Sequence, residues 1–220
     1  MHEPDAGVPQ NLISKGAVLR KFALAASACI VLSATFAYSQ QLDFAVSGST
    51  LWSPAANNSS EAFQPPAEKH GVYIGLNGDY VGIKYPRVGI NVESSWRYKQ
   101  GNYPFNGETY RPIFTDFNLL YQPHISKKLG GDLMAGVGIA DTRFYIPSNS
   151  FCSVPQGGCI NYTSSDHFME HLSGGLRYYF FRRYFIRPEI HYYHIQDNVG
   201  FHSDNVFRGG ASLGYTFGSR

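Results

Sequence analysis

The C-terminal stretch "RGGASLGYTFGSR", Arg208–Arg220, decides the fold. Apolar residues alternate along it, and from the residue before it, with small or polar ones. A period of two places successive side chains on opposite faces of an extended chain. The stretch therefore predicts a β-strand with one apolar face and one polar face. The apolar face holds Phe207, Ala211, Leu213, Tyr215 and Phe217, and the other holds Arg208, Gly210, Ser212, Gly214 and Thr216.

The same alternation divides the chain after Gln40 into about eight segments of roughly ten residues each. In the clearest of them, Val88, Ile90 and Val92 alternate with Asn91 and Glu93. The connections alternate in length: "KYPR", "QPHISKKLGG" and "FFRRY" are short, whereas those at 52–70, 100–110, 145–165 and 197–205 are mostly longer. Short turns at one end and long loops at the other are typical of membrane barrels. The pattern predicts an all-β, eight-stranded antiparallel up-and-down transmembrane β-barrel.

The N-terminal segment has the features of an export signal. Lys15, Arg20 and Lys21 precede the apolar run "FALAASACIVLSATFA", and Ala37 and Ser39 are small residues at the positions that a signal peptidase reads. The alternative is a membrane anchor, but the run has roughly 16 residues and a spanning helix needs ~20. We expect a cleaved signal peptide at 1–39 and one barrel domain at 40–220.

Composition and cysteine spacing restrict the class of protein further. Charged residues make up 15% of the chain, which is too few to coat an ordinary water-facing surface. The net charge of +2, without a basic patch, argues against nucleic acid as a partner. Cys152 and Cys159 flank a Pro-Gly-Gly turn, and in an exported protein this spacing predicts a local disulfide. Two free thiols are the alternative.

Alternation alone does not say which face of the barrel points inward, because a soluble lipocalin-type barrel has the same period with its apolar face inside. The composition of the polar face favours the membrane barrel. A sheet surface in water would be rich in Lys, Glu and Thr, but this face is mainly Gly, Ser and Asn with a few charges. Small residues leave room for a few long ones in a narrow lumen.

Two sets of residues follow from this orientation. Charged side chains on the polar face become buried and need to pair in a lumen network. Aromatic side chains near strand ends on the other face suit the lipid headgroup region. The expected network comprises Glu93, Arg97, Asp116, Arg177, Arg187, Glu189 and Arg208. The expected interfacial aromatics are Trp96, Tyr98, Tyr121, Tyr178, Tyr192, Tyr215 and Phe217.

An export signal, eight alternating strands and the final "GASLGYTF" together resemble the OmpA/OmpX-like group of outer-membrane β-barrels. In the pattern of that group, the chain would end on the aromatic residue, whereas Gly218, Ser219 and Arg220 follow Phe217 here. The resemblance implies a bacterial outer-membrane location. It also implies contact with outer-membrane lipid and lipopolysaccharide, recognition of the C-terminal strand by the barrel-assembly machinery, and a monomer. The group includes structural, adhesive and enzymatic members, so activity stays open.

The expected function is a structural or adhesion-like interaction through the outer loops, above a plugged polar lumen. The alternatives are a small pore, a lipid A-modifying hydrolase and a soluble lipocalin-like binding barrel. Deacylase barrels carry a His-x-Ser-Asn stretch, but Gln196 stands two residues after His194 where the nucleophilic serine is required. Along a strand, His167 and His171 lie roughly 13 Å apart, too far to share one ion. We therefore expect no catalytic residue, no cofactor and no metal site.

Overall fold

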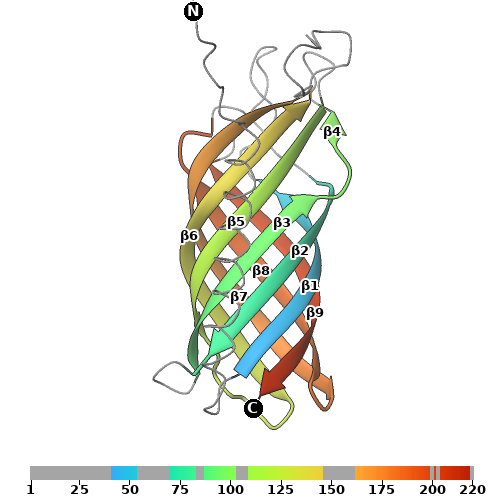
Figure 1. The fold of residues 1–220 in the computed structure, drawn as a ribbon, viewed down its shortest axis with the longest axis vertical. Helices are drawn as coiled ribbons and strands as arrows, with labels where there is room; N and C mark the ends of the chain where they lie inside the picture. Colours follow the sequence, from blue (N-terminus) through green and yellow to red (C-terminus); the bar gives the residue numbers. More distant parts are fainter. Residues whose placement is uncertain are drawn as a thin grey trace, which may run out of the picture. The chain divides into compact units, whose positions relative to one another are not determined.

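The computed structural model describes residues 41–53, 70–82, 87–102, 109–145, 162–198, 201 and 204–218. The expected signal peptide and the pair Cys152 and Cys159 lie outside these residues. No helix in the described ranges is long and apolar enough to cross a membrane. The described chain is made of antiparallel β-strands joined into one sheet (Figure 1).

Eight long strands follow one another along the chain, as the alternation predicts. They are β1 (Gln41–Trp52), β2 (Val72–Val81), β3 (Val88–Arg97), β5 (Thr109–Tyr121), β6 (Leu129–Tyr145), β7 (Tyr162–Phe181), β8 (Tyr184–Ile195) and β9 (Asn205–Gly218). A two-residue strand, β4 (Gly101–Asn102), pairs with the beginning of β5 and is an addition that the alternation did not predict.

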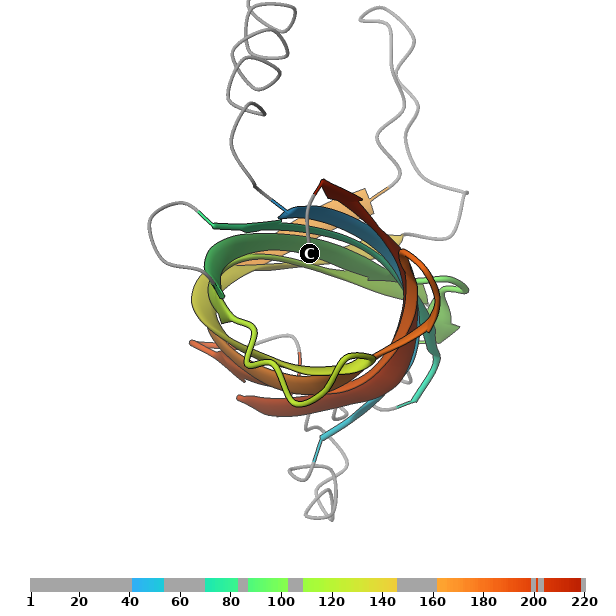
Figure 2. The same cartoon turned by 90° about the horizontal axis from the view of Figure 1, so that it is seen from below.

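The sheet closes on itself. Each long strand pairs with its neighbours in sequence, and β3 pairs with β5 directly. The ring is completed where β9 pairs with β1, in an unbroken register from Gln41↔Gly218 to Trp52↔Phe207. Figure 2 shows the closed ring from below. Closure gives each long strand a partner on both sides, although residues 162–168 of β7 pair with β6 alone at the long-loop end. A closed ring is the condition for a sheet to stand in lipid.

The two ends of the barrel differ. The turns β2–β3, β5–β6 and β7–β8 are short and lie at the end where β1 begins and β9 finishes (Figure 1). We call this the short-turn end. The connections that contain 54–69, 103–108, 146–161 and 199–203 leave the opposite end, the long-loop end.

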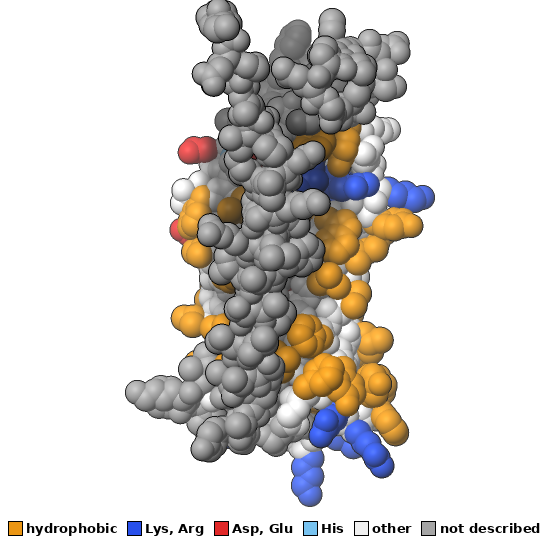
Figure 3. Space-filling model, viewed as in Figure 1, with side chains coloured by type: hydrophobic (Ala, Val, Ile, Leu, Met, Phe, Trp, Pro, Cys, Tyr) orange, Lys and Arg blue, Asp and Glu red, His pale blue; other side chains and the backbone are white. Residues whose placement is uncertain are grey.

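The apolar face of every strand points outward. Leu119 is 69% exposed and Ile190 is 60% exposed, although both are aliphatic residues within strands. Glu93, Arg187 and Arg208, on the opposite faces of their strands, are fully buried. Figure 3 shows apolar side chains over the visible wall of the barrel. A water-soluble barrel has the reverse distribution, so the lipocalin-like alternative is wrong and the barrel has a membrane-facing exterior.

Candidate functional site in the barrel interior

The interior near the short-turn end is organised around Arg177, which projects inward from β7. Its Nη2 lies 2.7 Å from the Oδ2 of Asp79 on β2, and its Nε lies 3.1 Å from the Oδ2 of Asp132 on β6. Its Nη1 donates to Asp43 on β1. The guanidinium also stacks over the ring of Phe185, 4.2 Å from its centroid. Through these hydrogen bonds, one buried arginine ties together four strands.

Arg187 on β8 shares two of these carboxylates. Its Nη1 lies 3.1 Å from the Oδ2 of Asp79 and 3.2 Å from the Oδ2 of Asp132, and its Nε donates to Glu189 at 2.7 Å. A buried charge is costly unless it is paired and hydrogen-bonded. Because each of the two aspartates bridges both arginines, the charges form one connected cluster, which we call the Arg177–Arg187 cluster.

A second ion pair lies in the same interior. Arg208 on β9 donates to Glu93 and to Ser95, both on β3. Its guanidinium lies 5.5 Å from the centroid of the Tyr193 ring, within cation–π range. Arg208, Glu93 and Ser95 are fully buried. The pair therefore links the last strand to a strand that is not its neighbour.

A chain of amide and imidazole groups runs from Asp79 toward this second pair. Asn91 Nδ2 donates to Asp79 Oδ1 at 2.6 Å, and Asn118 Nδ2 donates to Asn91 Oδ1 at 2.7 Å. The other Asn118 N–H is directed to Asp116. Asn118 Oδ1 must then act as an acceptor, so the Nδ1 of His171, 2.7 Å away, carries the hydrogen.

The chain continues to a second histidine. His171 Nε2 lies 3.0 Å from His191 Nδ1, so one hydrogen bond joins the two rings. The remaining His191 nitrogen, Nε2, lies 3.5 Å from Glu189 Oε1, and Nδ1 lies 3.9 Å from Glu93 Oε2. The two rings are nearly parallel at 5.2 Å. The histidine pair thus lies between the Arg177–Arg187 cluster and the Arg208–Glu93 pair.

Apolar side chains lie above and below the charged and hydrogen-bonded residues of the interior, toward the two ends of the barrel. Toward the short-turn end lie two small clusters, Ala45 with Tyr179 and Phe185, and Val81 with Leu120 and Met134. Toward the long-loop end lies a larger one, which contains Leu51, Tyr73, Phe114, Ala140, Met169, Tyr193, Ile195 and Val206. The Phe114 ring stacks on the Tyr193 ring at 5.2 Å, and Tyr193 stacks on His171 at 4.7 Å. The charges thus lie between two apolar layers.

Comparisons with solved structures match this fold to known membrane proteins. Neisserial surface protein A matches with a TM-score of 0.56 at 10% identity, over 82% of this chain and 98% of that chain. The attachment invasion locus protein Ail of Yersinia pestis, in complex with the heparin analogue sucrose octasulfate, matches with a TM-score of 0.51 at 11% identity, over 82% and 100%. This chain has the fold of the small eight-stranded outer-membrane barrels.

A major outer membrane protein of Thermus thermophilus also matches, with a TM-score of 0.51 at 10% identity, over 80% of this chain and 99% of that chain. No protein-family model and no curated protein matches the sequence. At such low identity the likeness concerns the fold alone. The resemblance to small outer-membrane barrels is confirmed at that level, and so is the outer membrane as the location that this fold and its apolar exterior indicate.

The structure brings together most of the charged residues that the alternation placed inside this outer-membrane barrel. Five of the seven make ion pairs with arginine or carboxylate partners: Glu93, Arg177, Arg187, Glu189 and Arg208. Asp116 lies against Asn118 and His171 instead. Arg97 lies away from the network near the long-loop end, half-buried, with its guanidinium 5.0 Å from the centroid of the Tyr110 ring.

The expected lumen network left out five members of the interior site, although alternation puts three of them, Asp79, His171 and His191, on the polar faces of their strands. Asp43, Asp79 and Asp132 supply three of the carboxylates around the arginines, and His171 and His191 lie between the two clusters. For Asp43 and Asp132 the same parity is the signal, because each stands an even number of residues from an inward position of its own strand. Among the described residues, no group of three His, Cys, Asp or Glu side chains is arranged to hold a metal ion.

The aromatic residues predicted at the interfaces lie on the outward face of their strands or, for Tyr98, one residue beyond the end of β3. Tyr98, Tyr121, Tyr178 and Phe217 are exposed, and Trp96, Tyr192 and Tyr215 are half-exposed. They form part of two belts of outward rings. The belt at the short-turn end comprises Tyr121, Tyr178, Phe181, Tyr184, Tyr215 and Phe217, and the belt at the long-loop end comprises Trp52, Trp96, Tyr98, Tyr192 and Phe207.

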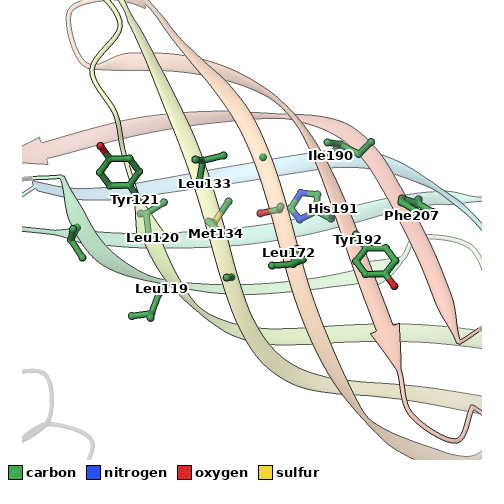
Figure 4. Close-up of a pocket in the computed structure, with 14 residues that line it drawn as sticks. Leu119, Leu120, Tyr121, Leu133, Met134, Leu172, Ile190, His191, Tyr192 and Phe207 are labelled. Atoms are coloured by element: carbon green, nitrogen blue, oxygen red, sulfur yellow. The ribbon is translucent and has the colours of Figure 1, made fainter.

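A shallow apolar groove crosses the outer wall between these belts (Figure 4). Small residues, Ala135 and Gly174, leave a depression between the larger side chains of Leu133, Leu172 and Ile190. The groove faces outward, so it belongs to the hydrocarbon-facing surface of the outer-membrane barrel and not to the polar interior.

Proposed function

We propose that this outer-membrane barrel is a closed scaffold that acts through its long loops by binding a partner outside the cell. The observation that carries the proposal is the buried charge layer between two apolar layers. Arg187, Glu93 and Arg208 are charged side chains of the barrel interior, and none of them has exposed surface. In an eight-stranded barrel the interior is just wide enough for side chains to fill. The interior is thus better suited to holding the wall rigid than to passing solutes.

The proposed place of activity is the end of the barrel where the chain is longest between strands. The long-loop end carries the connections that contain 54–69 and 146–161, whereas the short turns are restricted to a few residues. Loops on a rigid frame are where binding residues usually lie. Ail, one of the structures with this fold, was solved with a heparin analogue, sucrose octasulfate. That supports an adhesion-like role for the loops of this chain.

Planar-bilayer conductance tests the closed scaffold. Refolded wild-type barrel is expected to give no steady conductance, because a rigid ionic layer fills the interior. A variant with Glu93→Ala, Asp132→Ala and Arg208→Ala removes side chains from that layer and serves as the positive control, and it is expected to conduct. Steady single-channel currents from the wild type would overturn the proposal in favour of the small pore.

Adhesion of cells tests the role of the loops. Cells that display the wild type would be compared with cells that display a variant in which 146–161 is replaced by a Gly/Ser segment of equal length, on immobilised heparin and on extracellular-matrix protein. Heat-dependent gel mobility would verify that both barrels fold. Loss of adhesion in the variant is the expected result. Equal adhesion by the variant, by the matching replacement of 54–69 and by cells without the barrel would overturn the proposal.

The proposal includes that the protein is not an enzyme. The alternative, a lipid A-modifying hydrolase, requires an activated nucleophile next to a base. Incubation of the refolded barrel with lipopolysaccharide, followed by mass spectrometry of lipid A, is expected to leave every acyl chain in place. Release of a fatty acid would overturn this part of the proposal.

A further inference from the structure

The short turns of the barrel carry positive charge only. The three short connections, 82–87, 122–128 and 182–183, contain six Lys or Arg residues and no Asp or Glu. The long-loop end is different, because there Arg111 and Arg143 lie near Asp141 and Asp166. The described charges of the short turns, which we call the turn cations, are all exposed: Arg87, Lys127, Lys128, Arg182 and Arg183. Figure 3 shows Lys and Arg side chains gathered at this end.

Main-chain hydrogen bonds hold the turn cations at the rim. The carbonyl of Arg87 accepts from the N–H of Gln122 at 2.8 Å, which ties the β2–β3 turn to the β5–β6 turn. The carbonyl of Lys128 accepts from Tyr179 at 2.9 Å, and that of Arg183 accepts from Thr216 at 2.9 Å. Each turn is therefore fixed to the next element around the ring, which defines the backbone positions from which these side chains extend.

Two of the turn cations have a backbone conformation in which glycine would be less strained than arginine. Arg87 has a φ of 88° and Arg182 a φ of 39°, in the left-handed region where glycine is favoured. Backbone strain of this kind clusters at functional positions. The choice of arginine at both turns points to a use for the guanidinium group.

The depth of the turn cations identifies what they face. The belt of outward aromatic rings at this end marks the level of the lipid headgroups. Arg182 extends from the end of this belt, with its guanidinium 6.0 Å from the centroid of the Phe181 ring, and Tyr184 follows the turn on the outward face. Basic residues next to a bilayer surface attract anionic lipids, and arginine binds phosphate oxygens in bidentate fashion.

We propose that the turn cations bind the phosphate groups of anionic glycerophospholipids in the periplasm-facing leaflet. The partner is a lipid and not an acidic polymer of the cell wall, because the charges directly adjoin the aromatic belt and so lie at headgroup depth. The site fixes the barrel at its short-turn end, independently of what the loops bind. Lipids of zero net charge should not be enriched at this site.

Spin-labelled lipids measure the site directly. Wild-type barrel in phosphatidylcholine bilayers is expected to select labelled phosphatidylglycerol over labelled phosphatidylcholine, and the selectivity should disappear at high salt. The variant with Arg87→Gln, Arg182→Gln and Arg183→Gln should lose selectivity by about fivefold for each cation that contributes. The matched control, Arg111→Gln with Arg143→Gln, removes two arginines at the other end and should leave it unchanged.

Two further comparisons keep the test decisive. The variant Arg182→Lys with Arg183→Lys keeps the charge and should keep most of the selectivity, and Arg183→Gln alone serves if the triple variant does not show the heat-dependent gel mobility of a folded barrel. Selectivity that is equal in the wild type and in the Arg→Gln variants of the turn cations would overturn the proposal. So would co-sedimentation with purified cell-wall sacculi that depends on the turn cations while lipid selectivity does not.

Discussion

Arg208 on β9 donates to Glu93 on β3, a carboxylate 115 residues away in the chain and three strands away around the ring. Neither residue has exposed surface. Pairing between neighbouring strands fixes the wall of the barrel, but this contact fixes the distance across it. The interior network therefore holds the cross-section of the barrel in addition to satisfying its own charges.

Removal of one partner of this pair should be expensive. Glu93→Ala leaves the Arg208 guanidinium buried without its carboxylate, and we expect a loss of about 3–5 kcal/mol in the free energy of unfolding. Replacement of both residues, Glu93→Leu with Arg208→Met, should cost less than either single change because no unpaired charge remains. Urea unfolding of the refolded barrel in lipid vesicles, followed by tryptophan fluorescence, measures all three. Additive costs in the double variant would contradict the coupling.

The outward apolar face predicts a cost that depends on depth. Leu213→Arg places a charge on the lipid-facing side of β9 near the middle of the strand and should cost about 2–4 kcal/mol. Phe217→Arg, on the same face but at the headgroup level, should cost about 0–1 kcal/mol. The same urea experiment compares them. Equal costs at the two positions would show that the faces or the depth are assigned incorrectly.

Alternation was sufficient for the strands and for sorting their residues into two faces, and the composition of the polar face then decided which face points inward. Together they placed Arg187 and Glu93 inside without any knowledge of neighbours. Alternation could not say at what height along the barrel a side chain lies, since that depends on how far each strand is shifted against the next. Arg177 therefore reaches Asp43 across the ring, whereas Arg97 lies beyond the network despite the correct parity.

Proximity to a turn hid another member of the site. Asp132 directly follows the short connection that ends in Gly130 and Gly131, and so it reads as part of a loop. In the structure β6 begins already at Leu129, which places Asp132 inside the wall with its carboxylate between two arginines. The sequence signals for the beginning of a strand are weaker than those for its centre, and this residue depends on the boundary.

Two adjacent glycines on β9 test the closure of the barrel. A Cβ on Gly210 would collide with the backbone carbonyl oxygen of Gly48 on β1, whereas a Cβ on Gly209 would meet nothing within 4 Å. Gly210→Ala should therefore destabilise the barrel by about 1–3 kcal/mol, because the β1–β9 pairing must shift. Gly209→Ala, on the outward face, should be neutral within about 0.5 kcal/mol. The transition temperature for loss of heat-resistant gel mobility compares them, and a similar loss in both would contradict the predicted contact.

The chain of hydrogen bonds through Asn91, Asn118 and His171 predicts which ring nitrogen of His171 carries its hydrogen. Because both Asn118 N–H groups are directed to acceptors, His171 should carry its proton on Nδ1, which is observable as the ¹⁵N chemical shifts of a histidine-labelled sample. Asn118→Leu removes the acceptor and leaves buried polar groups on Asn91 and His171 unsatisfied, at about 1–3 kcal/mol for each. The variant should also lose the Nδ1–H signature of His171. A wild-type His171 with its hydrogen on Nε2 would contradict the assignment from Asn118 onward to His191, while the bond from Asn91 to Asp79 would keep its direction because a carboxylate only accepts.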